Sequence, residues 1–181
     1  WDQDGVHDIY RRWRRVLEEY DGDRVLVAEA WIPSPERLAR YVREDEMHQA
    51  FNFDFLASTW DAASYRRVIA ETMASNAAVG APTTWVLSNH DVVRHATRLA
   101  REDTSNTEGI SATDPQPDAA LGIRRGRAAT LMMLALPGSA YLYQAEELGL
   151  PEHTSVPDDL RQDPIWFRSE RDQVGRDGCR I

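Results

Sequence analysis

Apolar positions recur along the chain with two different spacings. Between residues 6 and 20 they fall three or four residues apart, with Arg and Glu between them, and this spacing predicts an amphipathic helix. Residues 61–77 and 119–136 have the same character and predict two further helices. Ser34-Pro35-Glu36 combines an N-cap residue, a proline for the first helical position and a first-turn carboxylate, so it predicts the start of a shorter helix.

Four short runs of β-forming or alternating residues predict strands between these helices. Strict alternation of strands and helices indicates the α/β class, with a parallel sheet and helices outside it. Residues 101–118 form a polar loop, which we expect to be functional or disordered, and the segment after residue 148 is irregular except for one helical turn near 158–161. The predicted strands are residues 24–30, 50–56, 83–88 and 139–143.

Composition narrows the range of partners. The formal net charge is −9 and no basic stripe is present, which argues against nucleic acid as a partner. No apolar run is long enough to span a membrane, so we expect no membrane association. Cys179 is the only cysteine, which excludes an internal disulfide and a Cys-based zinc site and favours a cytoplasmic location. We expect residues 1–181 to form one partial domain of a longer protein.

Polar side chains follow three of the four predicted strands. Glu29 ends the first, His90 and Asp91 follow the third, and Glu146-Glu147 follow the fourth. The carboxyl ends of parallel strands share one edge, and active sites of α/β folds lie there. We therefore expect Glu29, His90 and Asp91 to face one pocket.

Glu29 has the apolar neighbours Ala28, Ala30 and Trp31. Such surroundings predict a raised pKa, which suits a general acid, and a nearby Asp91 would raise the pKa further. Two carboxylates about 5 Å apart are the arrangement of retaining glycoside hydrolysis. A structural interpretation also exists, because a Glu at a strand end is often a cap or an ion-pair partner and Asn-His-Asp is a natural turn.

Taken in order, these segments resemble glycoside hydrolase family 13, the α-amylase and α-glucosidase superfamily. Val-Ala-Glu-Ala-Trp at 27–31 resembles the end of the fifth barrel strand, and residues 85–91 resemble the seventh. Residues 51–55 resemble the sixth strand, and 141–149 resemble the eighth, with Ala145 where the family usually has Gly. The closing residues 175–180 resemble the loop near the end of the catalytic domain. The resemblance implies a partial TIM (β/α)8 barrel of about strands 5–8 with their helices.

The resemblance also implies roles for individual residues. Glu29 would be the general acid/base and Asp91 the carboxylate that stabilises the transition state. His90 and Arg180 would bind the substrate, and Phe55 is placed to stack on the sugar ring. No metal or organic cofactor is implied.

The implied activity is that of an α-glucosidase of the oligo-1,6-glucosidase type, acting on α-linked gluco-oligosaccharides. Ala30-Trp31 after the Glu argues against trehalose synthase. The family's nucleophilic Asp stands in a Gly-Phe-Arg-x-Asp segment that does not occur among the 181 residues. We therefore expect the chain to be inactive alone.

Two other interpretations remain open. A sugar-binding module without catalysis would keep His90, Asp91 and Arg180 but would not need Glu29. A truncated structural fragment would need none of them. In either functional case the partner is a small oligosaccharide, and the open barrel edges at 24–30 and 139–143 predict self-association.

Overall fold

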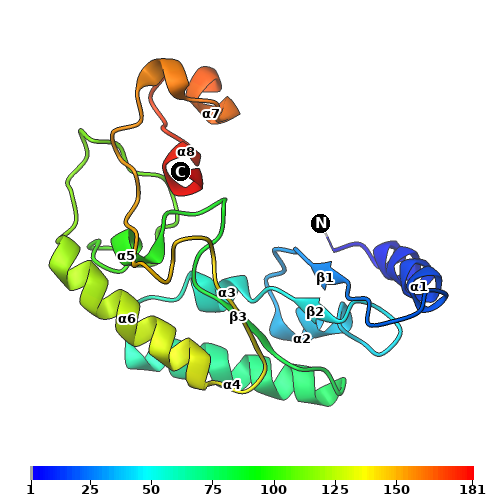
Figure 1. The fold of residues 1–181 in the computed structure, drawn as a ribbon. Coiled ribbons are helices and arrows are strands. Elements are labelled where there is room, and N and C mark those ends of the chain that lie inside the picture. The colour runs from blue at the N-terminus through cyan, green and yellow to red at the C-terminus, as the bar shows by residue number, and fades with distance from the viewer. Residues whose placement is uncertain (1) are drawn as a thin grey trace.

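The computed structural model describes residues 2–181, in which helices and short strands alternate (Figure 1). The strands are β1 (Val27–Ala28), β2 (Gln49–Ala50), β3 (Thr84–Val86) and β4 (Ser139–Tyr141). The three long helices are α1 (Gly5–Glu18), α4 (Ala62–Ala78) and α6 (Ala119–Ala135). The short helices are α2 (Pro35–Arg40), α3 (Phe53–Leu56), α5 (His95–Arg98), the 3-10 helix η1 (Asp158–Leu160), α7 (Pro164–Arg168) and α8 (Asp177–Arg180). The helical turn expected near 158–161 is confirmed by η1.

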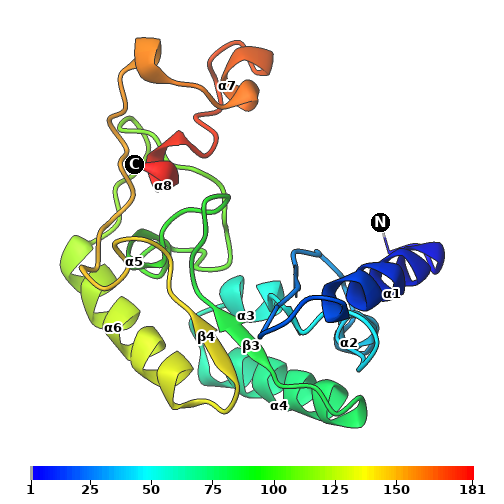
Figure 2. The same ribbon diagram turned by 45° about the vertical axis from the view of Figure 1, so that its right-hand side comes forward.

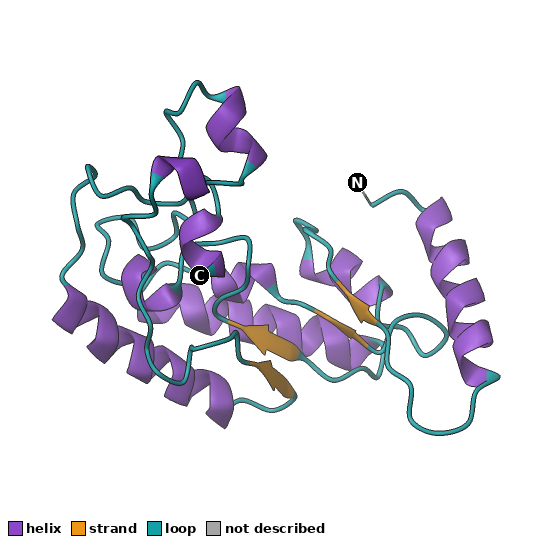
Figure 3. Cartoon of the chain, turned by 45° about the horizontal axis from the view of Figure 1, so that its top comes forward, coloured by secondary structure: helices purple, strands orange, loops and turns teal. Residues whose placement is uncertain are grey.

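The strands pair in parallel, as predicted, but in two separate pairs. β1 pairs with β2 through Val27 opposite Gln49, and β3 pairs with β4 through Trp85 opposite Ala140. Figure 2 shows the β3–β4 pair, and Figure 3 shows the strands of both pairs in orange. Side chains join the two pairs, because Gln49 donates to Ser139 Oγ at 2.9 Å and accepts from the Tyr141 hydroxyl at 2.6 Å.

The expected strand at 50–56 is wrong for most of its length. Only its first residue is in a strand, and residues 53–56 form α3 instead. Asn52 decides this outcome, because its Oδ1 accepts the Phe55 backbone N–H at 2.9 Å as an N-cap and its amide donates to Thr72 Oγ1 at 2.8 Å. The strand expected at 24–30 shortens to β1 because β2 offers only two residues for pairing.

The main core lies between β3 and the helices α3, α4, α5 and α6. Its centre is Trp85, whose side chain is completely buried and whose indole N–H donates to the Pro137 carbonyl at 2.8 Å. Phe55 and Met133 pack in the same cluster with no exposed surface. This core fixes the direction of β3 and so the place where the chain leaves it toward residues 88–91.

A smaller core joins β1 and β2 to α1 and α2. His7 on α1 contacts Glu46 at 2.6 Å, with both side chains buried. The outer side of α1 is not covered, since Trp13 is 53% exposed and Tyr20 is 61% exposed. The helix α6 lies on the opposite side of the molecule from α1 (Figure 1), and its Leu131 is 71% exposed. Within residues 2–181 no helix is both long and apolar enough to cross a membrane.

Candidate active site

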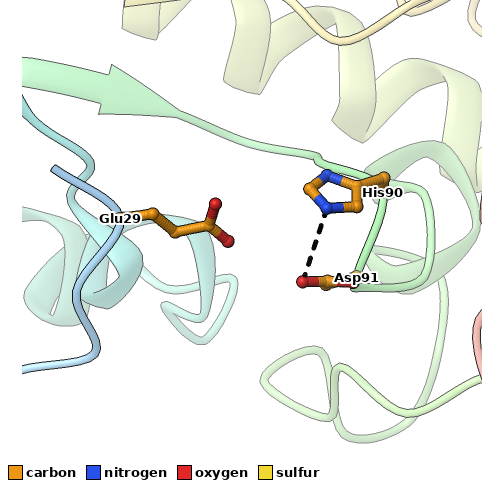
Figure 4. A group of neighbouring side chains, drawn as sticks. All are labelled: Glu29, His90 and Asp91. Carbon is orange, nitrogen blue, oxygen red and sulfur yellow. Dashed lines mark ion pairs between the residues drawn. The ribbon is translucent and has the colours of Figure 1, made fainter. Parts of the chain in front are cut away.

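Glu29 follows β1 directly, and its carboxylate points toward the turn after β3 (Figure 4). Its neighbours Ala28 and Ala30 are buried whereas Glu29 is exposed, because side chains alternate in direction along an extended chain. The aromatic neighbour Trp31 stacks instead on Phe53, with ring centroids 4.0 Å apart. The neighbours in the sequence therefore do not enclose this carboxyl, and Glu29 lines an open pocket.

His90 and Asp91 lie in a tight turn after β3. Asn89 forms this turn, since its Oδ1 accepts the Asp91 backbone N–H at 2.8 Å. The turn leaves the His90 imidazole exposed and Asp91 half-buried, with His90 Nε2 3.7 Å from Asp91 Oδ2. Both side chains are presented toward the end of β1.

The structure brings the three predicted residues together. Glu29, His90 and Asp91 each place one nitrogen or oxygen within 4.8 Å of the others (Figure 4). They come from the ends of β1 and β3, which are not hydrogen-bonded to each other. The structure thus brings the two predicted strand ends together, although only Glu29 and His90, and not Asp91, line the pocket between them.

Two arginines from the C-terminal segment complete the site around Asp91. Arg180 donates from Nη2 to Asp91 Oδ1 at 3.2 Å and from Nε to the His90 carbonyl at 3.0 Å. Arg176 donates from Nη1 to the same Asp91 oxygen at 2.9 Å. Arg180 was expected at the site from the sequence, but Arg176 was not, although it lies in the same Gly-Arg-Asp-Gly-Cys-Arg segment.

A pocket of about 190 Å³ opens beside these groups. Aromatic rings from β4 and from the chain after β2 form much of its wall, a surface suited to the apolar face of a sugar ring. The lining residues are Glu29, Phe51, Val86, Ser88, Asn89, His90, Tyr141, Leu142 and Tyr143.

Phe55 does not belong to this pocket. Its ring is completely buried against Tyr65 and Trp85, with centroids 5.4 and 5.0 Å away. The predicted stacking role of Phe55 is therefore wrong, and the cause is the helix α3, which turns it into the core. Phe51 takes the position beside the pocket, where its ring meets Tyr141 edge to face at 4.9 Å. Alternation places Phe51, Phe53 and Phe55 on the same side of a strand, so the sequence pattern could not identify which ring lies beside the pocket.

Asp91 and Arg176 also border a larger polar cavity of about 470 Å³. Its two sides are residues 107–114 of the long polar loop and residues 163–176 of the C-terminal segment. The loop is held by local turns, such as the two hydrogen bonds from Ser111 to the Asp114 carboxylate. In this structure the polar loop has a defined path and lines a cavity next to the site.

Glu146 and Glu147 do not join the site. Glu147 is exposed, whereas Glu146 is buried with its Oε1 3.6 Å from His95 Nδ1. Glu146 also accepts the Tyr143 backbone N–H at 2.8 Å and so shapes the loop after β4. Glu146 therefore holds the backbone of Tyr143, which lines the pocket.

Glu29, His90 and Asp91 have donor atoms close enough to share a metal ion. The two guanidinium groups on Asp91 oppose this use, because they occupy one carboxylate oxygen and supply positive charge where a cation would bind. The same set suits a neutral polyol, which can donate hydroxyls to the carboxylates and accept from the guanidinium and imidazole groups.

The model of the family described as "Alpha amylase, catalytic domain" matches residues 1–181. The chain therefore belongs to the α-amylase catalytic-domain family, whose fold is the TIM barrel, and it forms part of such a domain.

Among similar proteins, a probable alpha-glucosidase of Rhizobium meliloti (strain 1021) is 33% identical over 180 residues, which cover 96% of this chain and 28% of the relative. A trehalose synthase of Pimelobacter sp. (strain R48) is 31% identical over 181 residues, covering 84% of this chain and 31% of the relative. The crystal structure of an alpha-glucosyl transfer enzyme, XgtA, superimposes with a TM-score of 0.76 at 29% identity, covering 99% of this chain and 30% of that one. The chain thus spans less than a third of the length of these relatives.

Proposed function

We propose that residues 1–181 form about strands 5–8 of the catalytic barrel of an α-glucosidase-type retaining glycoside hydrolase, with its helices. The substrate class is α-linked gluco-oligosaccharides such as maltose and isomaltose. One observation carries the proposal: Glu29, His90 and Asp91 lie within 4.8 Å of one another beside an aromatic-walled pocket. We assign the general acid/base role to Glu29 and the stabilising role to Asp91.

In this mechanism Glu29 moves the protons. A carboxylate nucleophile that these 181 residues do not supply attacks the anomeric carbon while Glu29 protonates the leaving oxygen. The glycosidic C–O bond breaks as the new ester bond forms. Glu29 is then ionised, takes a proton from water, and the resulting hydroxyl cleaves the glucosyl ester. The open setting of Glu29 suits this double use, because water must reach it in the second step.

Asp91 and His90 act on the sugar rather than on the proton. Positive charge develops on the ring as it approaches an oxocarbenium ion, and Asp91 attracts that charge more strongly in the transition state than in the ground state. His90 and Arg180 bind sugar hydroxyls. Phe51 and Tyr143 contact the apolar face of the ring from the pocket wall.

The preference for an α-glucosidase over a trehalose synthase rests on Ala30-Trp31 after the catalytic Glu. Relatives with both names have similar identity to the chain, so an assay must separate them. Release of glucose from maltose supports the proposed class, and formation of trehalose from maltose contradicts it. The single Cys179 supports a cytoplasmic location, since a lone thiol fits a reducing compartment. Burial raises the pKa of this thiol to about 12, so it is protonated at neutral pH.

The first test uses the chain itself with p-nitrophenyl α-glucoside. We expect no turnover, because the nucleophile is absent, and we expect saturable binding of maltose by calorimetry. Glu29→Gln should leave maltose binding nearly unchanged, whereas Asp91→Asn should weaken it. Turnover that Glu29→Gln abolishes would contradict the expected inactivity. If the wild-type chain does not bind maltose, the proposed site is contradicted.

A further inference from the structure

A buried arginine connects the three segments that form the site. Arg94 comes three residues after Asp91 in the chain, and only 2% of it is exposed. Its Nη1 donates to the Gln144 carbonyl at 2.8 Å, and its Nη2 donates to the Ile181 backbone oxygen at 3.1 Å. The guanidinium therefore joins the turn after β3 to the loop after β4 and to the C-terminal segment.

The same guanidinium covers one face of a ring in the pocket wall. Its Cζ lies over the Tyr143 ring, 5.0 Å from the centroid, which is within the range of a cation–π contact. Tyr143 lines the pocket beside Glu29. Two further contacts hold this tyrosine, since its backbone N–H donates to Glu146 Oε2 at 2.8 Å and its hydroxyl accepts from Gln144 Nε2 at 3.3 Å. Of these contacts, only that with Arg94 is made to the face of the ring.

The direction of the Arg94 side chain is fixed from its backbone. The backbone N–H of Arg94 donates to Oε2 of buried Glu152 at 2.9 Å. Glu152 is itself held, because its backbone N–H donates to Thr97 Oγ1 on α5 at 2.8 Å. Burial raises the pKa of Glu152 to about 7, while the N–H group and the charge of Arg94 act in the opposite direction. Glu152 is therefore protonated part of the time at neutral pH and compensates the guanidinium charge only in part.

Stability alone does not explain an arginine at position 94. Neither of its two hydrogen-bond acceptors is a side-chain carboxylate, and its buried Nε has no partner among residues 2–181. Replacing such a buried charge by an apolar side chain is often neutral or stabilising. Gln144 and Ile181 are both exposed, so water can replace Arg94 as the donor to their backbone oxygens. The contact that water cannot replace is the one with the Tyr143 ring.

From these contacts we propose that Arg94 is a positioning residue for the sugar pocket, holding the Tyr143 ring in the orientation that forms the pocket wall. Arg94 is buried, so its effect on a bound sugar passes through Tyr143. The inference rests on the proposed function, because the orientation of this wall matters only if a sugar binds beside it.

Arg98 provides the matched comparison. It is the last residue of α5 and is completely buried, and its guanidinium also donates to two backbone carbonyls. These are the carbonyls of Leu87 at 2.9 Å and Thr104 at 3.1 Å. Both residues are buried, so water cannot easily replace the lost donor, and neither of them lines the pocket. Arg98 should therefore matter for stability and not for the sugar.

The test measures maltose binding by calorimetry and urea unfolding for Arg94→Met and Arg98→Met in the 181-residue chain. We expect Arg94→Met to weaken maltose binding by at least about tenfold with little change in the urea midpoint. Arg98→Met should lower the urea midpoint clearly but weaken maltose binding by less than about threefold. Arg94→Lys keeps a cation over the ring, so its maltose affinity should stay within about threefold of wild type.

A second measurement needs no sugar. The chain is labelled with 3-fluorotyrosine, and Tyr143→Phe and Tyr141→Phe identify the fluorine signals of the two tyrosines. Arg94→Met should move the Tyr143 signal toward that of free fluorotyrosine and leave the Tyr141 signal in place. Arg98→Met should leave both signals in place, because its carbonyl partners do not contact the Tyr143 ring.

Four results would overturn the proposal. They are unchanged maltose affinity in Arg94→Met, an equal loss of affinity in Arg98→Met, a full loss in Arg94→Lys, and an unmoved Tyr143 signal in Arg94→Met. Arg94→Gln also removes the cation and takes over the test if Arg94→Met does not fold, and Arg98→Lys does the same for Arg98→Met. A wild-type chain that does not bind maltose refutes the proposed function, whereas the sugar-free fluorine spectra still decide whether Arg94 holds the Tyr143 ring.

Discussion

Oε1 of buried Glu146 lies 3.6 Å from Nδ1 of buried His95 and has no hydrogen-bond partner among residues 2–181. Burial raises the pKa of Glu146 to about 7, and burial with the nearby Arg98 and Arg94 lowers the pKa of His95 to about 4. Between these values both groups are mostly neutral. The pair lies next to the turn that carries His90 and Asp91, because His95 Nδ1 is also 2.9 Å from Oγ of Ser88, which precedes that turn.

Glu146 should make the stability of the fold depend on pH. Its folded pKa lies above the ordinary value of 4.5, so the folded chain keeps a proton that the unfolded chain has lost. Its stabilising contribution is complete below pH 4.5 and falls as the pH rises through about 7. Relative to wild type, Glu146→Gln should therefore gain about 1 kcal/mol in free energy of unfolding between pH 6 and pH 8. Urea unfolding at the two pH values measures this.

Glu147→Gln is the control for this measurement, because the neighbouring Glu147 is exposed. It should change the pH dependence by less than about 0.3 kcal/mol. An equal response of the two variants would mean that burial of Glu146 does not determine its titration.

The site was predictable from the sequence where a residue type stands at a strand end. The pattern of β-formers ending in Glu29 and in Asn89-His90-Asp91 was sufficient, because parallel strands bring such ends to one edge. Arg176 could not be found in this way. Its contact with Asp91 joins residues 85 positions apart in the chain, so it depends on the folded path of the C-terminal segment.

The fold was predictable at the level of class and element order. The helices α4 and α6 occur where they were expected, and both have a clear cap. The side chain of Asp61 caps α4, and that of Asp118 caps α6. The strand at 50–56 failed because two signals compete there. Alternation of Phe with polar residues favours a strand, whereas the Asn52 cap and burial of Phe53, Phe55 and Leu56 favour a helical turn, and tertiary packing decides.

The two phenylalanines before and inside α3 should separate stability from binding. Phe55→Ala removes a fully buried ring and should lower the free energy of unfolding by about 3–5 kcal/mol. Phe51→Ala removes a half-buried ring at the pocket wall and should cost about 1–2 kcal/mol. Denaturant unfolding measures the two losses of stability. Maltose calorimetry should show weaker binding for Phe51→Ala only. Weaker binding by a folded Phe55→Ala with Phe51→Ala unaffected would reverse the assignment.

Two glycines of α6 should respond in opposite ways to alanine. A Cβ on Gly122 would lie 2.0 Å from the Ala96 carbonyl oxygen, so Gly122→Ala must push α6 away from α5. A Cβ on Gly126 would meet the His95 ring at 3.4 Å, which is close to ordinary contact. We expect Gly122→Ala to cost at least about 2 kcal/mol. Gly126→Ala should be neutral or stabilising by up to about 1 kcal/mol, because alanine favours a helix. Thermal melting of both variants checks the pair, and equal melting temperatures would contradict the close approach of α5 and α6.

The two uncovered ends of the molecule predict self-association of the 181-residue chain. Val27 of β1 and Trp13 of α1 are exposed at one end, and Leu142 after β4 and Leu131 of α6 are exposed at the other. Each of the four described strands is hydrogen-bonded to one partner only, so β1 and β4 both offer free backbone groups beside this apolar surface. Sedimentation velocity over a wide concentration range should show a mass that rises with concentration.

Single charged substitutions test whether these two ends, rather than another part of the surface, make the contacts between copies of the chain. Trp13→Arg and Leu131→Arg should each shift sedimentation toward the monomer, because contact between copies uses one end of each. Met73→Arg is the matched control, since Met73 is also exposed, at 40%, but lies on α4 between the ends. If all three variants and the wild type sediment as monomers, the strand edges do not cause self-association. If Met73→Arg disrupts association as strongly as the end variants, the contact lies elsewhere. Loss of association in the end variants alone would locate the surfaces that a complete barrel must cover.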